Sequence, residues 1–310
     1  MIETMDIREH VPLRPKTTMR IGGTARYFAE LRTREDAEEA VKFAQEQKLS
    51  IIPLGSGSNT IFADGEIDAL IVQVKHEAVT VDGSRITVGA GKNLAMLINE
   101  LALLGLDLSS LTGIPGTVGG AIFGNAGQGP KGVWIDSFVE SVTAYVDGEW
   151  RTLKKEEFGF SYRESRFKSS PPPSGEGLGL PTVALAKAGV GALIWEATLV
   201  VPSGDSSTIK ANIESLLKKR IETQPHMKTA GSCFKAVGDT PAWQLIDAVG
   251  LRGLKIGGVE ISPKHANFLI NTGEATFADA VNVIQTVKDK IPQGLEVEMR
   301  FVEENGKIRF

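Results

Sequence analysis

A run of small residues, Gly55-Ser56-Gly57-Ser58-Asn59, follows the apolar segment Ile51 to Leu54 and could bind phosphate. Glycine leaves backbone N–H groups free to approach an anion, and the serine hydroxyls add donors at short range. The run lacks the Gly-Lys-Ser/Thr ending of a P-loop and the spacing of a dinucleotide-binding fingerprint. On these residues alone, a flexible turn and a phosphate-binding loop are equally good interpretations.

A second glycine-rich stretch, from Gly113 to Gly127, is more informative. Each of its glycines costs conformational entropy when it is ordered, and a plain loop would use polar residues of mixed type instead. Such density is expected where the backbone approaches a flat ligand closely, so we predict a ligand-binding loop. The candidate ligand contacts in the two stretches are Gly55, Ser56, Gly57, Ser58, Asn59, Gly113, Ile114, Pro115, Gly116, Thr117, Gly119, Gly120, Ala121, Asn125, Ala126 and Gly127.

Composition excludes several other kinds of chemistry. The only cysteine is Cys233 and the four histidines are dispersed, so neither a disulfide nor a metal site is expected. The formal net charge is −4 with both signs interspersed, which favours neither nucleic acid nor a membrane as partner. The sequence shows neither a secretory signal nor a run long enough to span a bilayer, so we expect a soluble cytoplasmic protein. Difficult chemistry here would need an organic cofactor.

The elements that must position these loops are of mixed α and β type. Apolar spacing predicts helices over residues 33–48 and 93–104. Short β-type runs occupy residues 51–54, 69–74 and 86–88, and residues 138–146 and 150–153 form a predicted hairpin around Asp147-Gly148. A chain of 310 residues with this hydrophobic content is expected to form two or three globular units.

The C-terminal part has a pattern of its own. Residues 169–181, rich in proline and glycine, are predicted to be a surface loop, and a strand over 193–201 follows. A charged helix over 206–223 leads into further helices at 241–249 and 276–290 and strands near 255–261, 267–271 and 296–302. We therefore divide the chain into residues 1–204 and 205–310.

Short motifs spread over most of the chain resemble, in order, those of the UDP-N-acetylenolpyruvoylglucosamine reductases, also called UDP-N-acetylmuramate dehydrogenases. They are Thr17 to Gly23, Pro53 to Asn59, Gly113 to Gly127, Phe160 to Arg163, Ala230 to Lys235, His265 to Phe268 and Leu295 to Glu298. All these motifs occur in the same order as in the family, so a chance similarity is a poor explanation.

The resemblance implies an α+β protein with a two-subdomain FAD-binding fold of the vanillyl-alcohol oxidase type and a C-terminal α+β substrate-binding domain. It implies that NADPH reduces FAD, which then reduces the enolpyruvyl ether of a UDP-sugar in peptidoglycan precursor synthesis. Neither glycine-rich stretch contains a histidine, so the FAD is expected to be bound without a covalent link. The shorter subtype of the family and a monomer are expected.

The resemblance also assigns three catalytic residues. Arg163 would stabilise the enolate that hydride transfer creates, because its planar fork can hold the substrate carboxylate. Ser232 would donate the proton, and Glu296 would cooperate in stabilising the enolate, either protonated or through a hydrogen bond. On a regular strand Glu298 would project from the same face as Glu296. We prefer Glu296 because it directly follows Leu295 in the matched motif. Cys233, next to Ser232, is interpreted as packing.

Further residues of these motifs are candidate substrate contacts: Tyr162, Lys235, His265 and Asn267. His265 is equally plausible as a structural hydrogen-bonding residue. The family usually continues the Phe-Lys motif with Asn-Pro, whereas this chain has Ala236-Val237, which affects the expected contacts to the substrate diphosphate. An FAD-dependent oxidase of the same fold and a non-catalytic flavin or nucleotide-sugar binding protein remain as alternative functions.

Overall fold

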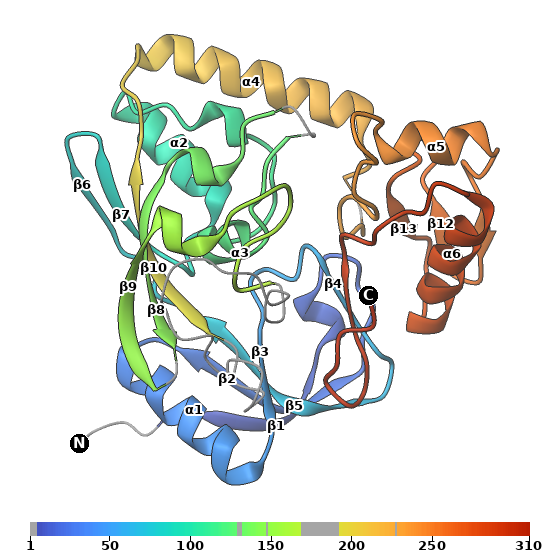
Figure 1. The fold of residues 1–310 in the computed structure, drawn as a ribbon, viewed down its shortest axis with the longest axis horizontal. Helices are drawn as coiled ribbons and strands as arrows, with labels where there is room; N and C mark the ends of the chain where they lie inside the picture. The colour runs from blue at the N-terminus through green and yellow to red at the C-terminus, as the bar shows by residue number, and fades with distance from the viewer. Residues whose placement is uncertain (1–4, 129–131, 147, 169–191, 227) are drawn as a thin grey trace, which may run out of the picture.

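The computed structural model describes residues 5–128, 132–146, 148–168, 192–226 and 228–310, which form three units (Figure 1). The predicted loop 169–181 and the hairpin residue Asp147 lie outside the described residues. Within the described ranges, none of the helices has both the length and the apolarity that crossing a bilayer requires.

The first unit is a four-stranded sheet with one helix packed on it. The strand order is β1 (Ile7–Pro12), β2 (Thr24–Leu31), β5 (Glu66–Val74) and β3 (Ser50–Pro53). Helix α1 (Arg34–Gln47) buries Ala37, Ala40, Val41 and Ala44 against this sheet. The Thr33 hydroxyl caps α1 by accepting a hydrogen bond from the Asp36 N–H, as the sequence predicts for a threonine at this position.

The second unit is an antiparallel sheet of five strands. Its order is β6 (Val79–Asp82), β7 (Arg85–Gly89), β10 (Leu193–Val200), β8 (Val139–Val146) and β9 (Glu149–Lys154). Helix α2 (Leu94–Leu103), capped by Asn93, packs the predicted apolar face formed by Leu94, Leu97, Ile98 and Leu101 into this core.

Single-turn 3-10 helices lie between elements at Arg14–Lys16, Ser109–Leu111, Ile135–Ser137 and Lys155–Phe158.

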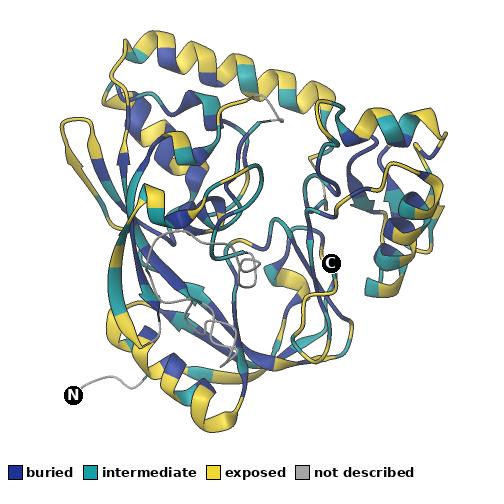
Figure 2. Cartoon of the chain, viewed as in Figure 1, coloured by how far each residue is buried: buried dark blue, intermediate teal, exposed yellow. Residues whose placement is uncertain are grey.

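Helix α4 (Ser206–Thr223) runs from the second unit toward the C-terminal unit (Figure 1). Its first half belongs to the core of the second unit, because Ile209 and Ile213 are buried there together with α2. The outer faces of α4 and α1 are largely exposed (Figure 2). The division after residue 204 stays a prediction; the packing of Ile209 and Ile213 indicates that α4 bridges the two parts.

The C-terminal unit packs two helices around a small sheet. It contains α5 (Ala242–Ala248), α6 (Phe277–Lys290) and the antiparallel strands β11 (Lys255–Ile256), β12 (Val259–Ile261) and β13 (Leu269–Asn271). Its core includes Val283, Ile284 and Val287 of α6. Met19 and Ile21, which precede β2, are buried in the same core, so a segment from the first part of the chain packs into the C-terminal unit.

After α6 the chain returns to the middle of the molecule. Strand β14 (Arg300–Val302) pairs in parallel with β4 (Thr60–Phe62), directly after the first glycine-rich run. The prediction of one strand over residues 296–302 was wrong at its start, because only residues 300–302 form a strand. Val297 makes a single bridge to Phe234 instead, so the chain changes partner within this segment.

Candidate active site

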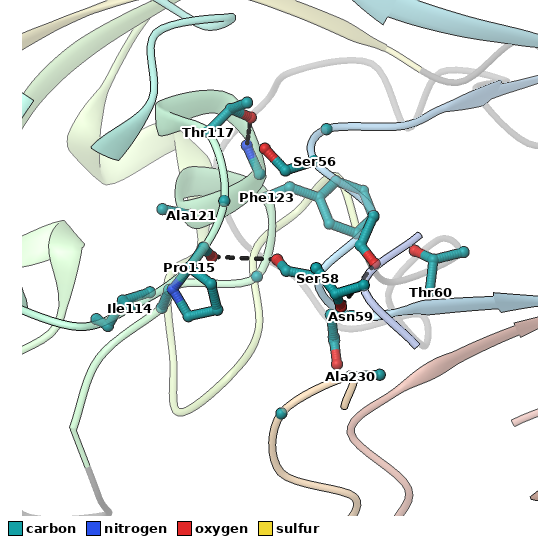
Figure 3. Close-up of a pocket in the computed structure, with 18 of the residues that line it drawn as sticks. Ser56, Ser58, Asn59, Thr60, Ile114, Pro115, Thr117, Ala121, Phe123 and Ala230 are labelled. Carbon is teal, nitrogen blue, oxygen red and sulfur yellow. Dashed lines mark hydrogen bonds between the residues drawn. The ribbon is translucent and has the colours of Figure 1, made fainter. Parts of the chain in front are cut away.

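A cavity of about 470 Å³ lies where the three units meet. Both glycine-rich stretches line it, as do the C-terminal end of α4, residues 228–232, Glu298 and Arg300. Its size is in the range of small-molecule and cofactor sites. The two stretches, far apart in the sequence, therefore face one cavity (Figure 3).

The run Gly55 to Asn59 forms one wall through its backbone. Gly57 has a φ of +65°, and a Cβ atom there would lie 2.2 Å from the Lys16 carbonyl oxygen, so only glycine fits without a shift. The Ser58 hydroxyl donates to the Pro115 carbonyl oxygen at 3.1 Å, which joins this wall to the second stretch (Figure 3).

The second stretch contains a short helix, α3 (Val118–Phe123), where the sequence predicted only a loop. The Thr117 hydroxyl caps it by accepting from the Gly120 N–H at 3.2 Å. Gly119 is packed so closely that a Cβ atom there would lie 2.8 Å from the Cβ of Ala90. The helix escaped prediction because two of its six residues, Gly119 and Gly120, are poor helix formers.

Asn125 is the one predicted ligand contact of this stretch that the cavity lining does not include. Its side chain is fully buried and donates to the Ser161 carbonyl oxygen at 2.9 Å. Asn125 therefore joins the second stretch to the turn that carries Tyr162 and Arg163.

Arg163 and Glu298 form an ion pair in the cavity, with Arg163 Nε 3.0 Å from Glu298 Oε1. Arg163 has a φ of +60°, an uncommon backbone conformation for a non-glycine residue, and its Nη2 donates to the Gly127 carbonyl oxygen at 2.8 Å. Burial raises the pKa of Glu298, and the cations Arg163, Lys168 and Lys235 oppose that rise without cancelling it.

Glu296, the carboxylate that the resemblance suggested, does not line the cavity. Its side chain is 69% exposed, and its Oε1 lies 2.5 Å from the Lys235 ammonium. Glu298 lines the cavity instead, because the backbone here is not a regular strand: Asn59 Nδ2 donates to the Glu298 carbonyl oxygen at 3.1 Å. Of these two glutamates, Glu298 is therefore the one that reaches the cavity.

Ser232 lines the cavity, and the adjacent Cys233 points into the protein core. Burial raises the pKa of the Cys233 thiol, which agrees with its interpretation as a packing residue. Asn267 does not line the cavity; its side chain accepts from the Phe234 N–H at 3.0 Å and donates to the Phe234 carbonyl oxygen at 2.9 Å. Asn267 thereby holds the segment that presents Ser232.

The other three predicted substrate contacts also lie beside the cavity and not in its lining. Lys235 bonds both Glu164 and Glu296; burial acts to lower its pKa, but the two carboxylates outweigh burial and raise it. The Tyr162 hydroxyl accepts from the Ala236 N–H at 3.4 Å. His265 Nδ1 accepts from the Asn267 N–H, and burial, followed by the nearby Arg252, lowers the histidine pKa.

Sequence reasoning missed several cations that line the cavity: Lys168, Arg220, Lys228 and Arg300. Lys168 and Arg300 stand next to matched motifs, five residues after Arg163 and two after Glu298, and that proximity was the available signal. In the described part of the chain, no three His, Cys, Asp or Glu residues come together as a group that could hold a metal ion.

These residues fit an extended dinucleotide such as FAD. A side chain at Gly57 or Gly119 would collide with Lys16 or Ala90, so glycine lets both walls pack closely against the neighbouring chain. Backbone N–H groups in glycine-rich loops suit a diphosphate. Val72, Val74 and Ile194 add apolar side chains to the lining, and Arg163, Ser232 and Glu298 line the same cavity. The cavity therefore offers both apolar surface for a ring and polar groups for an anionic ligand.

Family models match two parts of the chain. Residues 25–154 match a model described as an FAD binding domain, and residues 224–302 match one described as the C-terminal domain of UDP-N-acetylenolpyruvoylglucosamine reductase. The predicted fold class, an FAD-binding fold with a C-terminal α+β domain, is confirmed by these matches and by a solved structure. That structure is UDP-N-acetylenolpyruvylglucosamine reductase from Thermus caldophilus, with a TM-score of 0.79, 30% identity, and coverage of 96% of this chain and 99% of that one.

Curated relatives extend the similarity over nearly the whole length. The chain is 36% identical to the UDP-N-acetylenolpyruvoylglucosamine reductase of Chlamydia pneumoniae, over 97% of this chain and 94% of that protein. It is 34% identical to the enzyme of the same name from Moorella thermoacetica, over 95% of this chain and 91% of that protein. On the fold, the cavity and these relatives together, the chain belongs to the UDP-N-acetylenolpyruvoylglucosamine reductase family.

Proposed function

We propose that this protein uses NADPH and FAD to reduce the enolpyruvyl ether of UDP-N-acetylglucosamine to UDP-N-acetylmuramate, a step of peptidoglycan precursor synthesis. The observation that carries the proposal is the presence of Arg163, Ser232 and Glu298 in the lining of one cavity together with both glycine-rich stretches. A non-catalytic binding protein would not need an acid, a cation and a hydroxyl together in one cavity. Bound FAD supplies the hydride chemistry, which the side chains of this protein cannot supply.

Arg163 binds the substrate carboxylate in this proposal and stabilises the negative charge that spreads into it as hydride arrives. Its hydrogen bond to the Gly127 carbonyl oxygen and its ion pair with Glu298 hold the guanidinium in place before substrate binds. Preorganisation of this kind stabilises the transition state because no reorientation is needed during the reaction.

Glu298, and not Glu296, is the proposed acidic partner. An ionised carboxylate beside a developing enolate would repel it. Burial raises the pKa of Glu298 and so favours the protonated form, which can donate a hydrogen bond once the substrate carboxylate takes the place of Glu298 beside Arg163. Ser232 then delivers the proton to the carbon next to the one that received the hydride. Asn59 and Asn267 position these two groups through their hydrogen bonds to the Glu298 and Phe234 backbone.

The purified protein tests this proposal directly. It should be yellow, bleach anaerobically with NADPH, and regain its colour when UDP-N-acetylglucosamine enolpyruvate is added. Rapid reoxidation of the reduced protein by oxygen without any response to the enolpyruvyl substrate would indicate an oxidase instead.

We also propose that the protein works as a cytoplasmic monomer without nucleic acid or membrane partners. The dispersed charge and the nucleotide-linked substrate support this proposal. Light scattering of the FAD-loaded protein should give a mass close to 33.2 kDa, and a mass twice as large would contradict it.

A further inference from the structure

Lys235 is an enclosed lysine beside the cavity with two carboxylate partners. Its side chain is 8% exposed, and its ammonium group donates to Glu164 and, at 2.5 Å, to Glu296. Burial acts to lower the pKa of Lys235, but the two carboxylates outweigh burial and raise it. An ammonium group that has left water needs such partners, so Lys235 stays charged and paired.

Each partner of Lys235 is a close neighbour in the chain of a proposed catalytic residue. Glu164 directly follows Arg163, and Glu296 stands two residues before Glu298. Lys235 itself stands three residues after the proposed proton donor. One ammonium group therefore connects the three segments on which the proposed reaction depends.

Two of these segments are joined through their backbones. The Lys235 N–H donates to the Glu296 carbonyl oxygen at 2.9 Å, and Phe234 forms a bridge with Val297. Phe234 and Val297 are both buried in the core of the C-terminal unit. These two segments therefore belong to the C-terminal side of the cavity.

The third segment, the turn over residues 161–168, is anchored to the other side of the cavity. The Ser165 hydroxyl donates to the Phe123 carbonyl oxygen at 2.6 Å, and Arg163 Nη2 donates to the Gly127 carbonyl oxygen at 2.8 Å. Both acceptors belong to the second glycine-rich stretch. The turn that carries Arg163 is therefore held by a different part of the protein from the other two segments.

Two ion pairs link the two sides: Arg163 with Glu298, and Lys235 with Glu164. In the proposed reaction the substrate carboxylate takes the place of Glu298 beside Arg163, so the first pair separates when substrate binds. Lys235 and Glu164 lie outside the cavity lining, so the substrate can bind without displacing them. The second pair can therefore keep the two sides aligned during the reaction, when small displacements have large effects on rate.

We propose that Lys235 is a positioning residue, which keeps the turn that carries Arg163 aligned with the segments that carry Ser232 and Glu298 while Arg163 holds the substrate. The proposal rests on the proposed function, because it presumes that the substrate carboxylate separates Arg163 from Glu298. Lys235 acts in it through its two carboxylate partners and not as a direct substrate contact.

The test follows the flavin of FAD-saturated Lys235→Met by rapid-mixing absorbance. Reduction by NADPH should stay near the parent rate, because it does not require the enolpyruvyl substrate to be aligned. Reoxidation by saturating UDP-N-acetylglucosamine enolpyruvate should slow by roughly 10–10²-fold, as expected when reacting groups lose their alignment. The half-saturating concentration of that substrate should change little. Lys235→Arg, which can bond both carboxylates, should recover part of the rate.

The pH dependence of reoxidation is a second measurement, which loss of a merely structural contact would not change. Burial raises the pKa of Glu298, and the cations Arg163, Lys168 and Lys235 act against that rise. Removing the charge of Lys235 should therefore raise the Glu298 pKa further. Because the proposed mechanism uses protonated Glu298, reoxidation by Lys235→Met should persist to higher pH than in the parent, whereas Lys235→Arg should keep the parent profile.

Lys92→Met is the matched control. The Lys92 side chain is also enclosed, at 12% exposed, and pairs with Glu100 at 2.7 Å, but Lys92 lies outside the cavity lining. This variant should leave the reoxidation rate and its pH profile unchanged.

Three results with Lys235→Met would overturn the proposal. They are reoxidation at the parent rate, a loss confined to a higher half-saturating substrate concentration, which a direct substrate contact would give, and slower reoxidation with an unchanged pH profile. If Lys235→Met does not fold, Glu164→Gln tests the same ion pair from the other side; it should slow reoxidation, and parent-like reoxidation there would equally overturn the proposal. Failure of the proposed function would show separately, as reduced parent protein that the enolpyruvyl substrate cannot reoxidise.

Discussion

At the residue scale, Glu296 and Glu298 have the same side chain but different surroundings. Glu296 is exposed to solvent and pairs with Lys235, whereas Glu298 is enclosed in the cavity and pairs with Arg163. Strand alternation would put both side chains on the same face, but residues 296–298 make only the single Val297–Phe234 bridge. The backbone partners of the segment, which the sequence does not reveal, therefore decide which carboxylate reaches the cavity.

Replacing Glu298 with glutamine should remove a pH-dependent loss of stability. Burial raises the pKa of Glu298 above its ordinary 4.5, so the folded protein holds this proton more tightly than the unfolded chain does. Its contribution to stability is fully present below pH 4.5 and is lost as pH rises through the folded-state pKa. The free energy of unfolding of Glu298→Gln relative to the parent should therefore increase with pH across that window, in urea titrations at fixed FAD concentration. Glu296→Gln is the matched control, and the same trend there would contradict the assignment.

Ser232→Ala should separate the two halves of the reaction. Loss of one positioned acid is expected to slow reoxidation of the flavin by the enolpyruvyl substrate by roughly 10²–10⁴-fold, with reduction by NADPH nearly intact. Cysteine at this position should partly rescue the rate, because a thiol can also donate a proton. Rapid-mixing absorbance resolves both steps, and parent-like reoxidation in Ser232→Ala would remove the hydroxyl from the mechanism.

At the scale of elements, regular patterns were predictable and close backbone contacts were not. The caps Thr33 and Asn93 and the apolar faces of α1 and α2 follow local rules, and these helices formed where the sequence predicts them. Helix α3 and the short extent of β14 depend on packing against Ala90 and pairing with β4. Such contacts join residues far apart in the chain, so periodicity carries no signal for them.

The first glycine-rich run should tolerate no side chain at Gly57. Gly57→Ala combines the strain of a φ of +65° with a contact of 2.2 Å to the Lys16 carbonyl oxygen, so the wall must shift and the purified protein should lose most of its FAD. Gly83→Ala is the matched control, because Gly83 has a φ of +57° with nothing within 4 Å of the added atom. It should cost about 1 kcal/mol in stability and keep its flavin. Full FAD occupancy in Gly57→Ala, read from the absorbance spectrum, would count against a phosphate-binding wall.

At the scale of the whole molecule, β14 joins units that lie at opposite ends of the chain. Phe301 is buried in the core of the C-terminal unit, while its neighbour Val302 belongs to the core of the first unit. The cavity lies between these units, and Glu298 and Arg300 enter it from the segment that connects them. The geometry of the site therefore depends on the two cores remaining joined.

Phe301→Ala should loosen both units at once. Deleting this fully buried ring, which also contacts Phe277 and Phe310 edge-on, is expected to cost about 3–5 kcal/mol. Hydrogen exchange should then accelerate in both α6 and β5, because Phe301 packs in the core that contains α6 and its neighbour Val302 packs in the core that contains Ile67 and Ile71 of β5. Phe158→Ala is the control, since Phe158 is equally buried but lies in the core of the second unit, so exchange should accelerate first in β8 and β10. Faster exchange confined to α6 in Phe301→Ala would show that the C-terminal unit opens independently, and that β14 does not join the two cores.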